Sequence, residues 1–415
     1  MKLSLGYGKG NVELEVAETN LVGILEPHTP VISQSEKDVI FEALQNPIRS
    51  NPLSHCMNPG EKVAIITSDI TRPMPSSKVL PVIVDQVNRA GIPDRDICVV
   101  FGLGIHRPHA VEEHKQLMGE ELYERVKCMD SDPRNVVHLG RTSRGTPIDI
   151  FKPVVDADKR ICLGNIEYHY FAGFSGGMKA IMPGVSTRDA IEANHSHMLD
   201  EKAATGRIDD NPIRQDIDEV ADFLRIAFAF NVVLDEKKRI INAFAGHVID
   251  AHRQGCKYLD SIYRIEIPKP ADIVIVSPGG FPKDINLYQA QKALDNAGHA
   301  VKEGGTIILA ASCKEGFGEG VFEEWLLQSE TPDAILNRIR ESFRLGGHKA
   351  AAIAALLKKA KVRLVSDLPD DTVRSIFMTP CADVETALED ALREQGDDAS
   401  VIVMPYGGST LPCCS

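Results

Sequence analysis

Short runs of apolar and β-branched residues recur along the chain and have the length and composition of buried strands. They lie at Val63–Thr67, Ile97–Phe101, Ile161–Leu163, Ile273–Val276, Thr306–Ala310, Arg363–Val365 and Val401–Met404. Stretches with helical spacing of apolar residues separate several of these runs, at Lys78–Ala90, Leu287–Ala297 and Ala334–Phe343. Because strands that alternate with helices are typical of parallel sheets, the pattern predicts an α/β fold with mostly parallel sheets.

Two antiparallel pairs are expected beside these sheets. The start of the chain predicts two short strands joined by a turn at Gly6–Asn11. A second pair is expected at Arg225–Val233 and Arg239–Phe244, on either side of the charged turn Asp235–Lys238.

The chain is long enough for two domains, since its 415 residues exceed the usual size of one hydrophobic core. Two prolines in Ile267–Pro270, directly before a new buried strand, mark the best boundary. We therefore predict an N-terminal α/β domain over residues 1–266 and a C-terminal α/β domain over residues 267–415, with the active site between them.

The formal net charge of −13 argues against a nucleic-acid partner, because binding a phosphate backbone requires clustered lysines and arginines. A small anionic substrate would instead need a local basic cluster. No apolar run is long enough to span a membrane, and the first residues lack the apolar stretch of an export signal. The nine cysteines include no Cys-x-x-Cys pair, so we expect a protein of the reducing cytoplasm. Because no long apolar run is present, we expect no membrane partner.

Polar residues cluster where four predicted strands end, at Ser68–Pro73, Gly102–Pro108, His169–Lys179 and Gly279–Asp284. In open parallel sheets, ligands bind beyond the carboxyl ends of the strands. One such cluster is usually an ordinary turn. Four clusters at one edge, rich in histidine, lysine and arginine, favour a functional site instead.

The glycine-rich run Gly173–Gly177 is able to direct several backbone N–H groups at a phosphate. It is not a Walker loop, because Ala180 rather than serine or threonine follows Lys179. The pair Gly102 and Gly104 lacks the third glycine of a dinucleotide fingerprint. Ordinary nucleotide binding is therefore disfavoured.

Histidines in the same region are compatible with a metal site, since His195 and His197 lie two residues apart and His169 is able to join them in the fold, although most histidines are structural or exposed. A zinc site would need more ligands than this segment plainly supplies. A metal already surrounded by an organic ligand would need only one imidazole. The residues alone leave both kinds of site open.

Taken in order, the polar clusters resemble the nickel-pincer lactate racemase family of 2-hydroxyacid racemases. The matching segments are Asp69–Pro73, Gly104–Pro108, His169–Gly184, Asn194–His195 and Pro282–Lys292. The spacings also match, with 10 residues from His169 to Lys179, 16 from Lys179 to His195 and 3 from Gln289 to Lys292.

The resemblance implies a cofactor, a pyridinium-3,5-bisthiocarboxylic acid mononucleotide that holds nickel through sulfur, carbon and sulfur. Lys179 would carry it covalently, and His195 would be the nickel ligand contributed by the protein. Its single phosphate would suit Ser175, Gly176 and Gly177. Cofactor-synthesis enzymes are then expected as maturation partners.

The resemblance also implies the reaction, in which hydride leaves Cα of a small 2-hydroxy acid and returns to the opposite face. His106 and His169 would act as acid and base, since imidazole titrates near neutral pH. Arg72, Gln289 and Lys292 would bind the substrate, and Asp69 would orient a catalytic group.

Lactate is the expected substrate, because no further basic residue is assignable to a second carboxylate. The alternatives are another 2-hydroxy acid, such as malate or a longer aliphatic or aromatic acid, and a zinc-dependent hydrolase that uses the histidines. A cofactor-binding protein or maturation chaperone without turnover is a further alternative.

Overall fold

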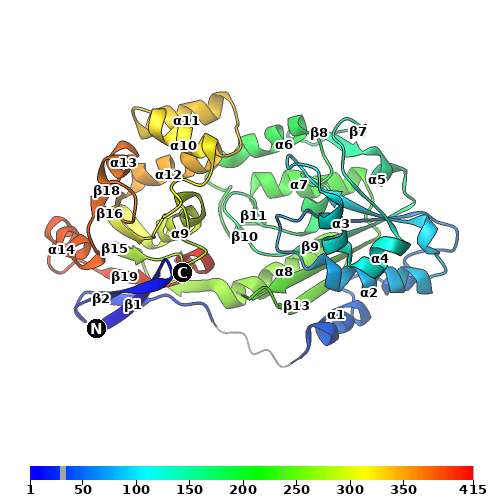
Figure 1. Cartoon of the computed structure of the whole chain (residues 1–415), viewed down its shortest axis with the longest axis horizontal. Coiled ribbons are helices and arrows are strands. Elements are labelled where there is room, and N and C mark those ends of the chain that lie inside the picture. Colours follow the sequence, from blue (N-terminus) through cyan, green and yellow to red (C-terminus); the bar gives the residue numbers. More distant parts are fainter. Residues whose placement is uncertain (29–33, 236, 415) are drawn as a thin grey trace. The chain divides into compact units, whose positions relative to one another are not determined.

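The structure, a computed structural model, describes residues 1–28, 34–235 and 237–414. The chain forms two compact units (Figure 1). One spans Pro30–Asp260 and is called the middle unit, and the other combines Met1–Thr29 with Ser261–Ser415 and is called the terminal unit.

The middle unit is built on a six-stranded sheet in the order β13-β12-β9-β4-β5-β6. The strands of the whole unit, which include the separate pairs β7 with β8 and β10 with β11, are β4 (Val63–Ser68), β5 (Ile97–Gly102), β6 (Lys127–Asp130), β7 (Val136–Arg141), β8 (Pro147–Phe151), β9 (Lys159–Asn165), β10 (Tyr168–His169), β11 (Gly173–Phe174), β12 (Phe228–Leu234) and β13 (Ile240–Gly246). Its helices are α1 (Glu36–Gln45), α2 (Ser76–Arg89), α3 (Val111–Met118), α4 (Glu120–Arg125), α5 (Lys152–Asp156), α6 (Arg188–His195), α7 (Pro212–Phe223) and α8 (Val248–Tyr263), the last of which runs into the terminal unit.

Helices cover both faces of this sheet. Apolar residues of α1 to α4 share one core with the sheet, and those of α5 to α7 share another. The first five residues of β4 are consecutively buried, as expected for a parallel strand covered on two sides. The pairs from β12 through β6 are parallel, whereas β12 and β13 are antiparallel.

The terminal unit has a second six-stranded sheet, in the order β18-β17-β16-β15-β19-β3, and all its pairs are parallel. The strands of this unit are β1 (Lys2–Tyr7), β2 (Gly10–Glu15), β3 (Leu21–Ile24), β14 (Arg264–Ile267), β15 (Ala271–Val276), β16 (Val301–Ala310), β17 (Lys361–Val365), β18 (Thr379–Cys381), β19 (Val401–Met404) and β20 (Leu411–Cys414). The helices are α9 (Leu287–Ala300), α10 (Gly320–Gln328), α11 (Pro332–Glu341), α12 (Gly347–Lys359), α13 (Asp370–Ser375) and α14 (Val384–Gln395).

The α/β class and the mostly parallel sheets are confirmed. All seven predicted strands form, as β4, β5, β9, β15, β16, β17 and β19, and the three predicted helices are α2, α9 and α11. Both antiparallel pairs also form, as β1 with β2 and β12 with β13. Glu236, part of the predicted turn Asp235–Lys238, lies outside the described residues.

The domain division differs from the predicted one at the beginning of the chain. The predicted boundary at 266/267 lies close to the division at 260/261, but residues 1–29 belong with the C-terminal part rather than with the predicted domain 1–266. The cause is β3, which pairs with β19 and completes the terminal sheet.

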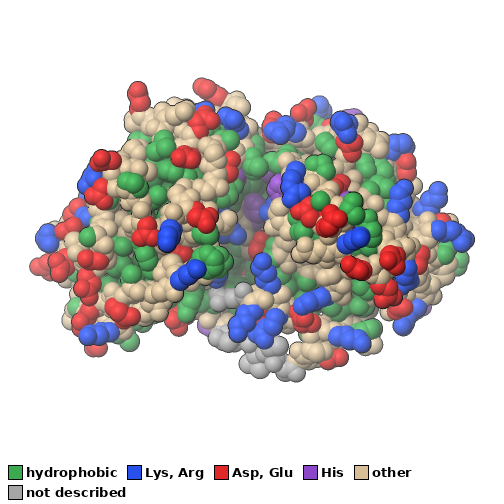
Figure 2. Space-filling view, in the orientation of Figure 1, with side chains coloured by type: hydrophobic (Ala, Val, Ile, Leu, Met, Phe, Trp, Pro, Cys, Tyr) green, Lys and Arg blue, Asp and Glu red, His purple; other side chains and the backbone are tan. Residues whose placement is uncertain are grey.

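Acidic and basic side chains are intermixed over both units on the face drawn in Figure 2. In the ranges that the structure describes, no helix combines the length and the apolar character needed to cross a bilayer. The nine cysteines all lie within those ranges, and all are thiols rather than disulfide partners.

Candidate active site

Three neighbouring parallel strands, β9, β4 and β5, bring most of the predicted site residues to one edge of the middle sheet. Asp69 and Arg72 follow β4, and His106 follows β5. His169 follows β9, in the small strand β10. The chain leaves each strand at its carboxyl end, so the loops meet at the edge where open sheets bind ligands.

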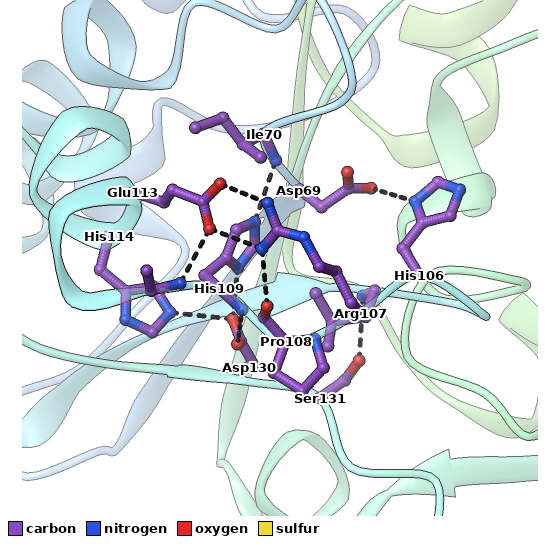
Figure 3. Close-up of polar contacts among 12 residues, drawn as sticks. Asp69, Ile70, His106, Arg107, Pro108, His109, Glu113, His114, Asp130 and Ser131 are labelled. Carbon is purple, nitrogen blue, oxygen red and sulfur yellow. Dashed lines mark hydrogen bonds and ion pairs between the residues drawn. The ribbon is translucent and has the colours of Figure 1, made fainter.

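Asp69 and His106 form a contact pair, with Oδ2 of the carboxylate 3.1 Å from Nδ1 of the imidazole (Figure 3). Burial alone would raise the pKa of Asp69, but hydrogen bonds from His106 and Thr71 lower it to about 2. The ionised carboxylate accepts, so Nδ1 of His106 is the donor. In its neutral form the ring then keeps a lone pair on Nε2, which is the nitrogen available to accept a proton.

His169 lies on a short hairpin whose two strands have two residues each, with Tyr168 paired to Phe174 and His169 to Gly173. The Ala172 N–H donates to Nδ1 of His169 over 3.3 Å. Burial, followed by the charges of Lys179, His195 and Arg72, lowers the pKa of His169 well below its usual value. The imidazole is therefore neutral, and these basic side chains are close enough to act on it.

His195 is the last residue of α6, and its ring makes a T-shaped contact with Phe171, with centroids 4.8 Å apart. Phe171 also contacts His169, with centroids 4.5 Å apart, so one phenyl ring touches both histidines. The buried Asn194 fixes the end of α6, because its amide donates to Asp216 over 2.8 Å and to the Ile213 carbonyl over 3.2 Å. Burial and then Lys179 lower the pKa of His195 to about 3.

Lys179 lies in a short 3-10 helix, Gly177–Ala180, directly after the hairpin. Burial, then Arg214 and Arg72, lower the pKa of Lys179 well below that of an ordinary lysine. Beside Lys179, Arg72 and Arg214 supply the local positive charge that an anionic ligand requires on an acidic protein.

Arg214 was not predicted from the sequence, where it reads as an ordinary helix arginine. It is completely buried in α7, and it donates to the carbonyl oxygens of Ala172 and Phe174. Its guanidinium also lies 3.6 Å from Asp218. Arg214 thus holds the segment between His169 and Lys179 while placing a positive charge beside both.

The glycine run does not have the arrangement expected of a phosphate site. The Ser175 N–H donates to the Glu167 carbonyl over 2.8 Å, and the Gly177 N–H donates to Asn231 over 2.9 Å. A Cβ on Gly176 would lie 2.9 Å from Asn231, and one on Gly177 would lie 2.8 Å from His252. These glycines are therefore explained by tight packing, and the contacts do not support the predicted phosphate role of Ser175, Gly176 and Gly177.

The remaining predicted residues, Gln289 and Lys292, lie in the terminal unit. They are exposed one turn apart near the start of α9, which Asn286 caps by accepting from the Gln289 N–H over 3.0 Å. Arg107, in the matching segment after β5, forms an ion pair with Glu113 at 2.6 Å.

The three histidines considered for zinc do not form a ligand group. Within the described ranges, the one group of three or more metal-binding side chains is His109, His114 and Asp130. Neither His169, His195 nor His197 belongs to it.

Comparisons with known families cover both units. The chain matches the family "Lactate racemase N-terminal domain" over residues 7–206 and the family "Lactate racemase C-terminal domain" over residues 267–411. It is 35% identical to the lactate racemase of Thermoanaerobacterium thermosaccharolyticum over 99% of this chain and 98% of the relative. It is 34% identical to the lactate racemase of Lactiplantibacillus plantarum over 98% of each chain.

Solved structures agree with these matches. The lactate racemase apoprotein from T. thermosaccharolyticum superposes with a TM-score of 0.89, over 99% of this chain and 100% of that one, at 35% identity. A Thermotoga maritima protein of 17% identity has a TM-score of 0.65, covers 94% of this chain and all of its own, and shows a shared fold only.

Proposed function

Since the chain belongs to the lactate racemase family and is an isomerase, we propose that it interconverts D- and L-lactate with a nickel-pincer mononucleotide attached to Lys179. The observation that carries the proposal is the cluster around Lys179. Burial and two arginines lower the pKa of Lys179, and this lysine lies beside two neutral histidines. An ordinary turn does not require a lysine of lowered pKa beside two neutral histidines, whereas a site for a bound cofactor does.

Lys179 fits the attachment point. A primary amine attacks a carboxyl-type carbon only in its unprotonated form, and the surroundings of Lys179 favour that form. Arg214 contributes to this effect without contacting solvent, since its side chain is fully buried.

His195 fits the nickel ligand. A histidine binds a metal through an unprotonated ring nitrogen, and burial favours the neutral imidazole. Ni(II) held by the sulfur donors of the organic group would accept one imidazole as well, so the protein would need to supply only this one ligand.

When bound, the group would supply an acceptor and donor for the hydride at Cα of lactate. The chain's own residues act on the hydroxyl proton and the carboxylate of the substrate. His106, with Nδ1 donating to Asp69, accepts the hydroxyl proton at Nε2, and His169 serves the opposite enantiomer. The exposed guanidinium of Arg72 binds the carboxylate, and Gln289 and Lys292 are proposed to assist it.

The proposal extends to the protein's surroundings in the cell. The mononucleotide has to be made and loaded by cofactor-synthesis enzymes, which are the proposed maturation partners. Nine cysteine thiols favour a cytoplasmic location, where cysteines stay reduced.

The test is to produce the chain together with the cofactor-synthesis enzymes and to measure intact mass, nickel content and lactate racemisation. Lys179→Ala is expected to lose the added mass, the nickel and the activity. Lys202→Ala is the matched control, because Lys202 is exposed in a neighbouring segment. Retention of the adduct in Lys179→Ala would refute the attachment, and malate racemised in preference to lactate would reassign the substrate.

A further inference from the structure

A second polar network, formed by Ile70, His109 and Asp130, lies next to the Asp69–His106 pair and involves none of the proposed catalytic residues (Figure 3). The Ile70 N–H donates to Nε2 of His109 over 3.0 Å. On the other side of the same ring, Nδ1 of His109 lies 2.6 Å from Asp130, at the end of β6. Asp130 also accepts from the His109 backbone N–H over 2.8 Å.

The protonation state of His109 follows from these partners. A backbone N–H is only a donor, so Nε2 must present its lone pair to Ile70. In the neutral ring the proton then lies on Nδ1, which donates to Asp130. Burial alone would raise the pKa of Asp130, but hydrogen bonds from His109 and His114 lower it, so the carboxylate is the acceptor that this arrangement requires.

The same protonation state argues against a metal in the group His109, His114 and Asp130, although their ligand atoms lie within 4.8 Å of one another. A histidine that binds a metal through one nitrogen normally donates its other N–H to an acceptor. Nε2 of His109 faces the Ile70 N–H, which is unable to accept. A metal on Nδ1 would therefore require a ring without any proton.

The position of Ile70 gives the network its importance. Ile70 lies between Asp69, which orients His106, and Arg72, which is proposed to bind the substrate carboxylate. The His109 side chain is only 1% exposed, so water does not replace it as acceptor for the Ile70 N–H. Phe101 packs edge-on against the ring of His109, with centroids 5.5 Å apart, and limits its movement.

We propose that His109 is a positioning residue that ties the Asp69–Arg72 loop to Asp130 on β6, so that the base-orienting carboxylate and the substrate-binding guanidinium keep their places together. The inference rests on the proposed function for its kinetic consequences. Its structural content, the fixed Ile70 N–H, is independent of activity.

Two substitutions separate the two hydrogen bonds of the His109 ring, the one at Nε2 with the Ile70 N–H and the one at Nδ1 with Asp130. The amide of His109→Gln reaches the place of Nε2, so its oxygen is able to accept from the Ile70 N–H. The shorter amide of His109→Asn reaches only the place of Nδ1 and keeps a contact with Asp130 alone. His114→Gln is the matched control, because His114 also contacts Asp130, at 2.9 Å, and stacks on Phe101, but is not the acceptor for Ile70.

The first measurement is hydrogen–deuterium exchange of the segment 68–75 in the nickel-loaded enzyme. We expect the Ile70 amide to exchange about tenfold faster or more in His109→Asn, because an amide without its acceptor loses protection. His109→Gln and His114→Gln should retain most of the protection. Equal exchange in His109→Asn and the original protein would overturn the proposal.

The second measurement is steady-state lactate racemisation. Because the loop carries both Asp69 and Arg72, His109→Asn should lower kcat and raise KM, with a combined loss in kcat/KM of up to about 100-fold. The Lys179 adduct and the nickel content should stay unchanged, and His109→Gln should recover most of the loss. A loss as large in His109→Gln as in His109→Asn would contradict the role of the Ile70 contact.

The outcomes distinguish this inference from the proposed function. If the original loaded enzyme does not racemise lactate, the proposed function fails, whereas the exchange experiment still decides the role of His109. If stoichiometric zinc or nickel binds to protein made without cofactor and is lost in both His114→Gln and Asp130→Asn, the group is a metal site and the positioning role is wrong.

Discussion

At the scale of single residues, the two proposed acid–base histidines have different surroundings. His106 lies against the ionised Asp69, whereas His169 lies among positive charges and accepts a backbone N–H. In their neutral forms, His106 presents a lone pair at Nε2 and His169 presents an N–H there, so the pair offers one acceptor and one donor for the hydroxyl proton, as transfer to the opposite face of the substrate requires.

We therefore predict that replacing either histidine by glutamine blocks racemisation in both directions, with a loss of about 10²–10⁴-fold in turnover. In a single turnover, however, each variant should be slow in forming the keto acid from one enantiomer only. Rapid-quench measurement of keto acid from pure D- and L-lactate checks this. If both variants slow both enantiomers equally, one histidine only orients the substrate.

For His195→Ala we predict loss of nickel with the organic adduct retained, because the imidazole binds the metal and Lys179 binds the organic group. Intact mass and metal analysis of the same sample provide the two readouts. His197→Ala is the control and should keep its nickel. The reverse result would transfer the ligand role to His197.

At the scale of elements, the short hairpin β10–β11 decides where His169 and Lys179 lie. Gly173 pairs with His169 and has a φ of 74°, a conformation that side chains disfavour. A Cβ there would overlap the Arg207 carbonyl oxygen, so the packing leaves no room for one.

Gly173→Ala is thus expected to lower the free energy of unfolding by about 2–5 kcal/mol, since backbone strain and steric overlap add. Gly145→Ala is the matched control, because Gly145 has a φ of 87° and, among the described residues other than its two chain neighbours, no atom lies within 4 Å of the place that a Cβ would take. It should cost about 1–2 kcal/mol from the backbone alone. Urea unfolding of both variants measures the difference, and equal losses would show that the Arg207 contact relaxes freely.

At the scale of the whole molecule, Lys292 of the terminal unit is proposed as a substrate-binding residue. Lys292→Met is expected to raise the KM for lactate about tenfold or more, because a charge-assisted hydrogen bond to the carboxylate is lost. The Lys179 adduct should be unaffected. Lys314→Met, which removes another exposed lysine of the terminal unit, should leave the KM unchanged. An unchanged KM in Lys292→Met would remove this residue from the substrate site.

The sequence by itself determined the α/β class, the strands and the loops that carry the candidate site. Buried parallel strands are continuous apolar runs, and the polar residues that follow them are adjacent in sequence, so local patterns suffice. Asp69, His106 and His169 were predicted in this way. The phosphate role of the glycine run was inferred from the conformational freedom of glycine and from the family resemblance, neither of which reveals that Asn231 and His252 occupy the space around it.

Only the tertiary structure decided which distant segments meet. The pairing of β3 with β19 places residues 1–29 in the terminal unit, although the two strands lie at opposite ends of the chain. The contact of Ile70 with His109 joins positions 39 residues apart, and Arg214 reaches carbonyl oxygens 40 and 42 residues away. The physical reason is that buried polar groups must find partners wherever the fold brings them, and such partners leave no periodic signal in the sequence.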